Sequence, residues 1–318
     1  MGHRKHSAPR RGSLAYRPRG RAKSLFPRIR NWPNVENDKP TILGYPAFKA
    51  GTIHVITVDD RAKTPNFGKP LFNMSSVLSM PGTEVVGLRL YSHEDGRDLP
   101  IADVKTAGQT SEKLPLERAK RVAAVISTIP RDVGLSQKKP FVMEVGVSGA
   151  DLKTQTDYVL GLIGKKVKFA DVFKAGMYVD VLGITKGKGF EGPVTRFGIK
   201  RKQHKSRKSV RAVGVIGPWH PAAVMYTIAR AGQMGFHQRT ETGKRILMTA
   251  NAAEKPITPV GGFPHFGEVR GDYALVRGSV PGPARRFVMV RMRLRGVTKN
   301  PAPPQVIELS PMIGRRAG

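Results

Sequence analysis

Two strongly basic stretches of the sequence cannot be buried in a protein core, and they limit what the rest of the chain can form. Residues 1–35 contain ten Lys or Arg and no acidic residue, and residues 183–211 contain ten against the single acid Glu191. A segment like residues 1–35 buries too little apolar surface to offset its ordering entropy, so alone we expect it to be disordered. The core must therefore come from the remaining parts of the chain.

The overall charge points to a polyanionic partner. The chain has 318 residues, a formal net charge of +32 and a pI near 10.9. Charge of one sign repels itself, and a polyanion relieves that repulsion. Nucleic acid is the first candidate, and an anionic membrane surface is a much weaker one. The length suits one large or two ordinary domains.

Several other classes of protein are excluded by what the sequence lacks. Cysteine is absent, which rules out disulfides, thiolate catalysis and cysteine-ligated zinc. The first residues have no apolar core of signal-peptide length, and no run approaches the roughly 20 apolar residues of a membrane span. We therefore expect a soluble, intracellular protein that does not bind membranes.

The motifs that resemble catalytic sites fail on their spacing. In "GITKGKGF" the second glycine comes one residue early for a phosphate loop, and Gly189 stands where Ser or Thr would bind magnesium. The histidines form no HExxH motif, and no Gly-x-Ser-x-Gly elbow occurs. The sequence thus predicts no enzyme, no cofactor, no metal and no small-molecule substrate.

The sequence from about residue 40 onward predicts a mainly β fold with an α-helical insertion. Apolar residues follow a helical period over 116–126, and Asp151 is placed to cap a helix that ends near Gly164, so we expect the insertion at about 100–170. Short strands punctuated by Gly and Pro at irregular spacing favour a closed barrel over a parallel sheet. The expected strands are 52–58, 85–91, 141–147, 178–184 and 287–294.

The run 183–211 leads directly into the motif "GPWHP" at 217–221. The run follows an expected strand and has no periodic apolar face, so we interpret it as a projecting arm. Pro218 and Pro221 restrict the backbone around Trp219, which lowers the entropy cost of presenting the ring. The alternative is a tryptophan buried at a turn. The following residues, 221–232, suit either a helix or an extended return.

Aromatic residues are interleaved with the cations of this region, which favours RNA over duplex DNA, because unpaired bases stack on aromatic rings. A DNA-compacting protein or an RNA-processing factor would share the charge and remains an alternative. The aromatic residues are Phe190, Phe197, Trp219, Tyr226 and Phe236.

Several motifs, in order along essentially the whole chain, resemble one protein family. "VDVLGITKGKGFEGPVTRFGIKRK", "GPWHP", "RAGQMGFHQRTE" and "YALVRGSVPGPARR" closely resemble the universal ribosomal large-subunit protein L-three family. "HRKHSAPRRGSLAYRPRGRAK" is similar to the amino-terminal arm of its archaeal and eukaryotic branch. The resemblance implies a translation-type closed β-barrel with long basic extensions that enter ribosomal RNA.

The same resemblance implies a function. Family members are structural, early-assembly binders of large-subunit RNA, located in the cytoplasm beside neighbouring ribosomal proteins, without catalytic residues of their own. A central finger reaches toward the peptidyl transferase centre, its tip is placed at Trp219, and 221–232 becomes an extended return. The candidate RNA-binding residues are Arg10, Arg11, Arg17, Arg19, Arg21 and Lys23 in the arm, and Lys186, Lys188, Arg196, Lys200, Arg201, Lys202, Lys205, Arg207, Lys208, Arg211, Trp219 and His220 in the finger.

These expectations divide the chain into five parts. The expected parts are a basic arm (1–35), the first part of the barrel with its insertion (36–195), a central finger with its tip near 217–221 (196–236), the second part of the barrel (237–310) and a short tail (311–318).

Overall fold

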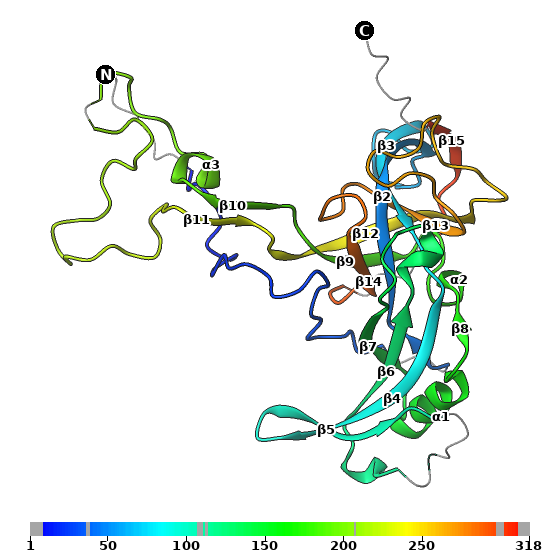
Figure 1. The fold of residues 1–318 in the computed structure, drawn as a ribbon. Helices are drawn as coiled ribbons and strands as arrows, with labels where there is room; N and C mark the ends of the chain where they lie inside the picture. Colours follow the sequence, from blue (N-terminus) through cyan, green and yellow to red (C-terminus); the bar gives the residue numbers. More distant parts are fainter. Residues whose placement is uncertain are drawn as a thin grey trace. The chain divides into compact units, whose positions relative to one another are not determined.

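Antiparallel strands make up most of the regular structure in the computed structural model of the chain, and its helices are few and short (Figure 1). The expected mainly β class is therefore confirmed. No described helix is long and apolar enough to cross a membrane. The structure describes residues 9–35, 39–106, 111, 114–206, 208–296 and 302–310.

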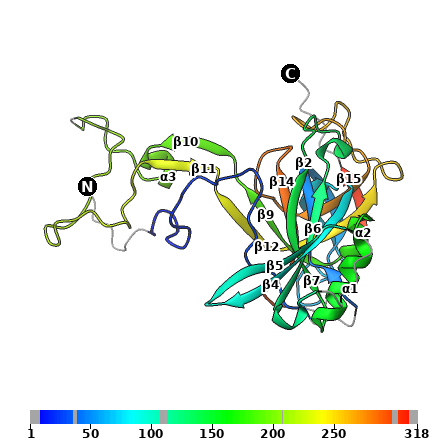
Figure 2. The same cartoon turned by 60° about the horizontal axis from the view of Figure 1, so that its bottom comes forward.

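The larger sheet has the strand order β14-β9-β12-β13-β3-β2-β15, and β14 pairs with β2 as well as with β9. Figure 2 labels its strands β2, β9, β12, β14 and β15. Its longest ladder is antiparallel and joins β2 to β3. The inward residues of these strands, such as Ile53, Val55 and Val290, are fully buried. The strands are β2 (Gly44–Val58), β3 (Pro70–Ser79), β9 (Tyr178–Ile184), β12 (Gln238–Asn251), β13 (Asp272–Arg277), β14 (Phe287–Met292) and β15 (Val306–Ser310).

The second sheet has the order β1-β7-β6-β4-β5, with β8 paired to β4. The helix α1 lies against β4 and β6 (Figure 1). The elements are β1 (Thr41–Ile42), β4 (Thr83–Glu94), β5 (Arg97–Val104), β6 (Arg121–Thr128), β7 (Phe141–Ser148), β8 (Lys166–Val167), α1 (Leu152–Leu162), α2 (Phe169–Val172) and the short 3-10 turns η2 (Leu116–Arg118) and η3 (Pro130–Val133).

All five expected strands are confirmed, because each lies within β2, β4, β7 or β9 or overlaps β14. One of the two expected helices is also confirmed. The helix α1 begins after Asp151, whose carbonyl accepts the Gln155 amide at 3.1 Å, although the Asp151 side chain makes no capping bond. Gly164 follows the helix with φ of 80°, as a residue after a helix end often does.

The expected helix at 116–126 is wrong. Residues 116–118 form the turn η2, and 121–128 form β6, which pairs with β4 on one side and β7 on the other. A strand buried on both faces has a nearly continuous apolar run, and such a run contains helically spaced residues by chance. The region expected as a helical insertion, 100–170, therefore contains strands as well as α1.

The last part of the basic arm packs on the protein itself. The Trp32 ring lies against the core so closely that a Cβ on Gly44 or Gly146 would come within 2.8 or 2.6 Å of it. Phe26 meets Phe141 edge to face, with ring centroids 6.0 Å apart. Ile29 also packs against the core. Part of the segment expected as the basic arm, 1–35, therefore belongs with the core.

A buried ion pair ties this segment to the sheet. The Arg291 guanidinium donates to the Asp180 carboxylate at 2.9 Å and to the Asn31 carbonyl at 2.6 Å. The same carboxylate accepts the backbone amides of Gly243 and Leu294. Both charged side chains are almost fully buried. One ion pair thus fixes four separate segments of the chain.

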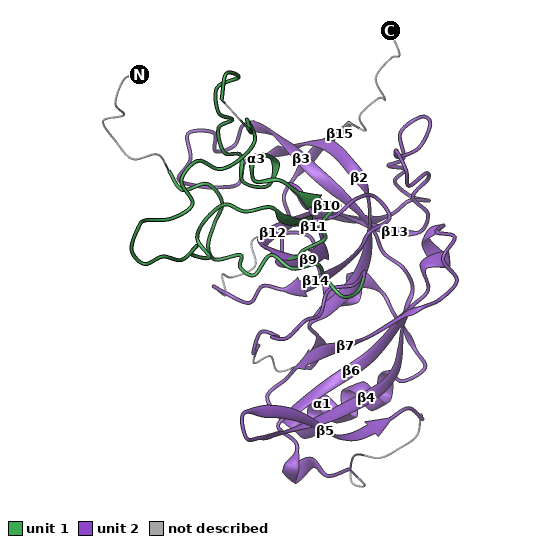
Figure 3. Cartoon of the chain, turned by 60° about the vertical axis from the view of Figure 1, so that its left-hand side comes forward, with its two compact units in different colours: residues 1–24, 185–238 green, residues 25–184, 239–318 purple. Residues whose placement is uncertain are grey.

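The chain divides into two compact units (Figure 3). Unit 1 comprises residues 1–24 and 185–238, and unit 2 comprises residues 25–184 and 239–318. These boundaries differ from the expected ones for two reasons: residues 25–35 contact the core, and residues 185–195 begin a hairpin that belongs to unit 1. The expected tail, 311–318, lies outside the described residues.

Candidate nucleic-acid interface

Unit 1 concentrates the positive charge of the chain. It contains nineteen Lys or Arg and one acid, Glu191, in about a quarter of the sequence. Every candidate binding residue that the structure describes lies in this unit; Arg207 lies outside the described residues. We call residues 9–24 the arm and residues 185–238 the central extension (green in Figure 3).

The central extension starts as a two-stranded hairpin. Strand β10 (Gly187–Glu191) pairs antiparallel with β11 (Gly232–Gly235), and both Lys186 and Lys188 are exposed on it. Gly235 has φ of 71°, and a Cβ there would lie 1.9 Å from the Lys186 carbonyl oxygen. The glycines of this region therefore serve a tight hairpin, and the two lysines extend from it into solvent.

A short helix, α3 (Pro193–Phe197), follows β10 and places Arg196 against the returning strand. The Arg196 guanidinium donates to the carbonyls of Gln233 at 3.0 Å and Arg230 at 3.1 Å, and it lies 5.2 Å from the centre of the Phe197 ring. Burial, followed by the nearby Arg17 charge, lowers the pKa of Arg196. These internal contacts make Arg196 an organiser of the extension.

The remaining cations of the extension lie on an exposed loop. Among the described residues of 199–231 there is no helix or strand, so a helix at 221–232 is wrong; this segment contains turns, with a 3.1 Å bond from the Ile228 amide to the Met225 carbonyl. Within this loop, the Lys202 amide donates a backbone hydrogen bond to the Val210 carbonyl at 3.0 Å. Arg211 donates to the Thr195 hydroxyl at 3.3 Å. The exposed cations of the loop are Lys200, Arg201, Lys202, Lys205, Lys208, Arg211 and Arg230, of which all but Arg230 are candidate binding residues.

Trp219 is 87% exposed, so the alternative of a tryptophan buried at a turn is wrong. Its ring meets that of His220 edge to face at 6.3 Å, and His220 is exposed too. Of the other aromatic candidates, Phe190 and Tyr226 are 78% and 68% exposed, whereas Phe197 is buried. The extension thus presents large rings, as well as charge, to solvent.

The arm is held against the base of the extension by His237, which is not one of the candidate RNA-binding residues. The backbone amide of Gly235 donates to the His237 Nε2 atom at 3.1 Å, so Nδ1 carries the proton and donates to the Gly20 carbonyl at 2.8 Å. The His237 amide donates to the Thr185 hydroxyl at 3.1 Å. A single histidine with unknown partners gives no sequence signal for such a role.

The cations of the arm lie in three different environments. Arg17, Arg19 and Arg21 lie over aromatic rings of the extension. Arg10 donates to the Thr227 carbonyl. Arg11 and Lys23 are exposed.

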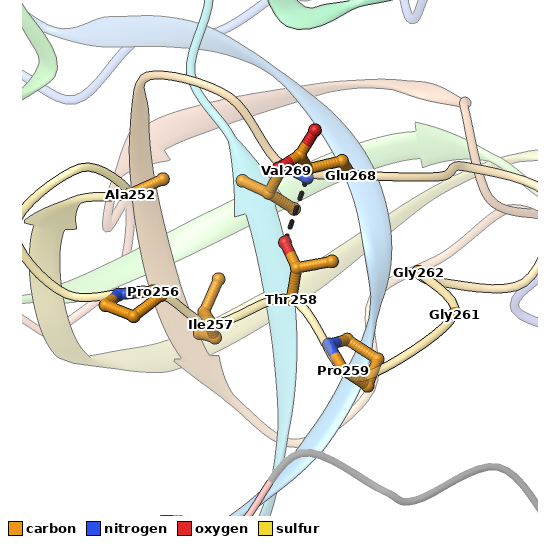
Figure 4. A pocket seen from close by; sticks show the side chains of 9 residues that line it. All are labelled: Ala252, Pro256, Ile257, Thr258, Pro259, Gly261, Gly262, Glu268 and Val269. Atoms are coloured by element: carbon orange, nitrogen blue, oxygen red, sulfur yellow. Dashed lines mark hydrogen bonds between the residues drawn. The ribbon is translucent and has the colours of Figure 1, made fainter.

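Neither a metal site nor the pocket after β12 provides an alternative to unit 1. No group of three or more potential metal ligands occurs among the described residues. A pocket in the loop after β12 has Glu268 as its only charged lining residue, which is the wrong sign for a phosphate (Figure 4). The pocket is lined by Ala252, Pro256, Ile257, Thr258, Pro259, Gly261, Gly262, Glu268 and Val269.

An exposed, cation-rich extension with solvent-facing rings is typical of a nucleic-acid-binding protein. Comparison with known proteins identifies the family. The family model for ribosomal protein L3 matches residues 1–120 and 102–310. The chain therefore belongs to the ribosomal protein L3 family.

Three archaeal relatives carry the name "Large ribosomal subunit protein uL3". The one from Methanococcus maripaludis is 40% identical over 96% of this chain and 97% of its own length. The one from Caldivirga maquilingensis is 42% identical over 90% of each chain. The one from Pyrobaculum calidifontis is 41% identical over 96% of this chain and 98% of its own length.

Proposed function

We propose that this chain is a structural RNA-binding protein of the large ribosomal subunit in the cytoplasm, and that it performs no chemistry itself. The observation that carries the proposal is the nearly one-signed charge of unit 1, with nineteen cations against one acid. Such a surface binds a phosphate backbone by releasing counterions. Because the chain belongs to the ribosomal protein L3 family, we assign the RNA of the large subunit as its main partner and the neighbouring ribosomal proteins as further partners.

The finer role concerns the tip of the central extension. In this proposal the chain binds early in assembly, and the extension carries Trp219 toward the peptidyl transferase centre, where the ring supports the catalytic RNA. The 87% exposure of Trp219 supports this role, because a ring without core contacts is available for stacking on a base. His220, beside it, is the second tip contact.

The phosphate contacts are assigned to the exposed cations. On the hairpin these are Lys186 and Lys188, and in the arm they are Arg11 and Lys23. Their side chains extend into solvent, as contacts with a sugar–phosphate backbone require. In the loop they are Lys200, Arg201, Lys202, Lys205, Lys208 and Arg211.

We further propose that the larger sheet closes into a barrel. The support is that β14, the first strand in the sheet order, pairs with β9 on one side and with β2 on the other, which joins β14, β9, β12, β13, β3 and β2 in a ring. In this architecture the barrel strands come from residues 44–184 and 238–310, and the central extension between them forms the finger.

The test compares binding of the full chain to a structured large-subunit RNA and to duplex DNA at matched salt. If about ten phosphates are neutralised, the logarithm of the affinity should fall with the logarithm of salt with a slope of about −7 to −9. Tighter binding to RNA supports the proposal. A slope of about −2, or equal affinity for duplex DNA, would overturn it.

Cosedimentation of the native protein with the large subunit tests the location. A protein that stays outside the particle at physiological salt would contradict the ribosomal assignment even if it binds RNA in isolation.

A further inference from the structure

Three arginines at alternate positions of the arm each lie over a different ring of the central extension. The Arg17 guanidinium lies 5.2 Å from the centre of the Tyr226 ring. The Arg19 guanidinium lies 4.4 Å from the Phe197 ring, and that of Arg21 lies 5.5 Å from the Phe236 ring. All three distances are within the range of a cation–π contact. The alternate spacing suits an extended arm that presents every second side chain to one surface.

Backbone bonds continue the contact beyond the last of these rings. The Ala22 amide donates to the Phe236 carbonyl at 2.8 Å, and the Gly20 carbonyl accepts the His237 ring proton at 2.8 Å. Both bonds lie next to Arg21 in the sequence. They fix the register of the arm on the extension, so each arginine faces one particular ring.

The start of the arm is shaped for the same contact. Gly12 has φ of 78°, a conformation that L side chains rarely adopt. A Cβ at Gly12 would come 2.6 Å from an Arg19 nitrogen and 2.8 Å from the Phe197 ring. Phe197 itself is buried, with Arg19 and Arg196 both close to its ring. Only glycine allows the arm to fold back over this ring.

These contacts counteract the electrostatic repulsion between the arm and the central extension. The arm and the extension carry charge of the same sign, which should drive them apart in the free protein. The negative faces of the rings attract a guanidinium, and arginine is more weakly hydrated than lysine, so stacking on a ring costs it less hydration. Three ring contacts and the backbone bonds therefore offset the repulsion locally.

We propose that residues 10–24 are docked on the central extension before any RNA binds, and that Arg17, Arg19 and Arg21 are positioning residues for the interface. In this assignment the three arginines hold the two basic segments as one preorganised body. The exposed cations of that body make the phosphate contacts. The docking stands on intramolecular contacts alone; only its effect on RNA affinity rests on the proposed function.

The test exchanges the three arginines for lysine in the full chain without RNA. The variant Arg17→Lys/Arg19→Lys/Arg21→Lys keeps every charge and removes the planar group that stacks. Hydrogen exchange over 10–24 should then become about tenfold faster. The matched control changes three exposed arginines whose guanidinium groups lie over no ring among the described residues: Arg11→Lys/Arg201→Lys/Arg230→Lys. The control should leave exchange over 10–24 unchanged.

A second pair of variants tests the ring side of the contact. Tyr226 is largely exposed, so its replacement should not unfold the protein. Tyr226→Leu should speed exchange around Arg17, and Tyr226→Phe, which keeps the ring, should restore the wild-type rate. Equal exchange in both Tyr226 variants, or wild-type exchange over 10–24 at the rate of a free peptide, would overturn the docking.

The RNA readout separates positioning from charge. Because the lysine triple variant keeps all its cations, its salt slope should equal that of the wild type, while its affinity for large-subunit RNA falls by about tenfold. Loss of docking with unchanged RNA affinity would overturn the positioning role. A protein that shows the docking but binds no large-subunit RNA would keep the docking and overturn the proposed function instead.

Discussion

The two tryptophans of the chain provide a matched comparison between a tip residue and a core residue. Trp219 is 87% exposed, and its ring contacts that of His220. Trp32 lies against the core, over Gly44 and Gly146. The substitutions Trp219→Ala and Trp32→Ala remove the same side chain from these two environments. Their effects on the free energy of unfolding should therefore differ strongly.

The magnitudes follow from burial. Trp219→Ala removes no core contact, so the free energy of unfolding should change by less than about 0.5 kcal/mol. Trp32→Ala leaves an unfilled space above two glycines, and large aromatic deletions of this kind cost about 3–5 kcal/mol. Part of the Trp32 ring is exposed, so we expect the lower end of that range.

The assay is denaturant unfolding of each variant, with RNA binding measured in parallel. The Trp219→Ala protein retains Trp32 as its only tryptophan, so its fluorescence reports unfolding of the core directly. The Trp32→Ala protein is followed by circular dichroism. In RNA binding or in the assembled particle, loss of the Trp219 ring should cost about 1–3 kcal/mol, the value of one base stacked on an aromatic side chain.

Two results would refute this reasoning. One is a loss of several kcal/mol in the unfolding free energy of Trp219→Ala, which would place that ring in a core. The other is wild-type RNA affinity together with normal peptidyl transfer in subunits that contain the Trp219→Ala protein. That result would show that the Trp219 ring makes no contact with RNA that matters for binding or peptidyl transfer.

Three further predictions concern the scaffold. Asp180→Ala leaves the buried Arg291 charge unpaired and should lower the free energy of unfolding by about 3–5 kcal/mol, measured by denaturant titration. Burial raises the pKa of Tyr45 to about 12 from 10.0, so the stability that this group contributes is complete below pH 10 and is lost as the pH rises through 12; Tyr45→Phe should show a smaller loss of stability than the wild type over that range. Gly235→Ala places a Cβ 1.9 Å from the Lys186 carbonyl oxygen, so exchange in the β10–β11 hairpin should rise sharply, whereas an unchanged hairpin would contradict the close approach.

The location of five strands and of the exposed basic segment could be predicted from the sequence. Alternating or continuous apolar runs placed the segments within β2, β4, β7, β9 and β14, because strand formation depends on local side-chain pattern. The cations of 183–211 have no apolar face with which to bury, so local composition already placed them outside a core. The exposure of Trp219 was one of two alternatives left open by its flanking prolines.

The tertiary structure decided every feature that depends on a distant partner. Residues 116–126 satisfy a helical period, yet 121–128 form β6 because β4 and β7 provide hydrogen bonds on both sides. In the sequence, Arg17, Arg19 and Arg21 look like phosphate-binding residues of a basic arm. Only the folded extension shows that each of them faces a ring. Trp32 stands among cations like an arm residue, but its ring lies against Gly44 and, much further along the chain, Gly146. A sequence pattern records what a segment can bury, whereas the surface that covers it is supplied by residues outside that segment.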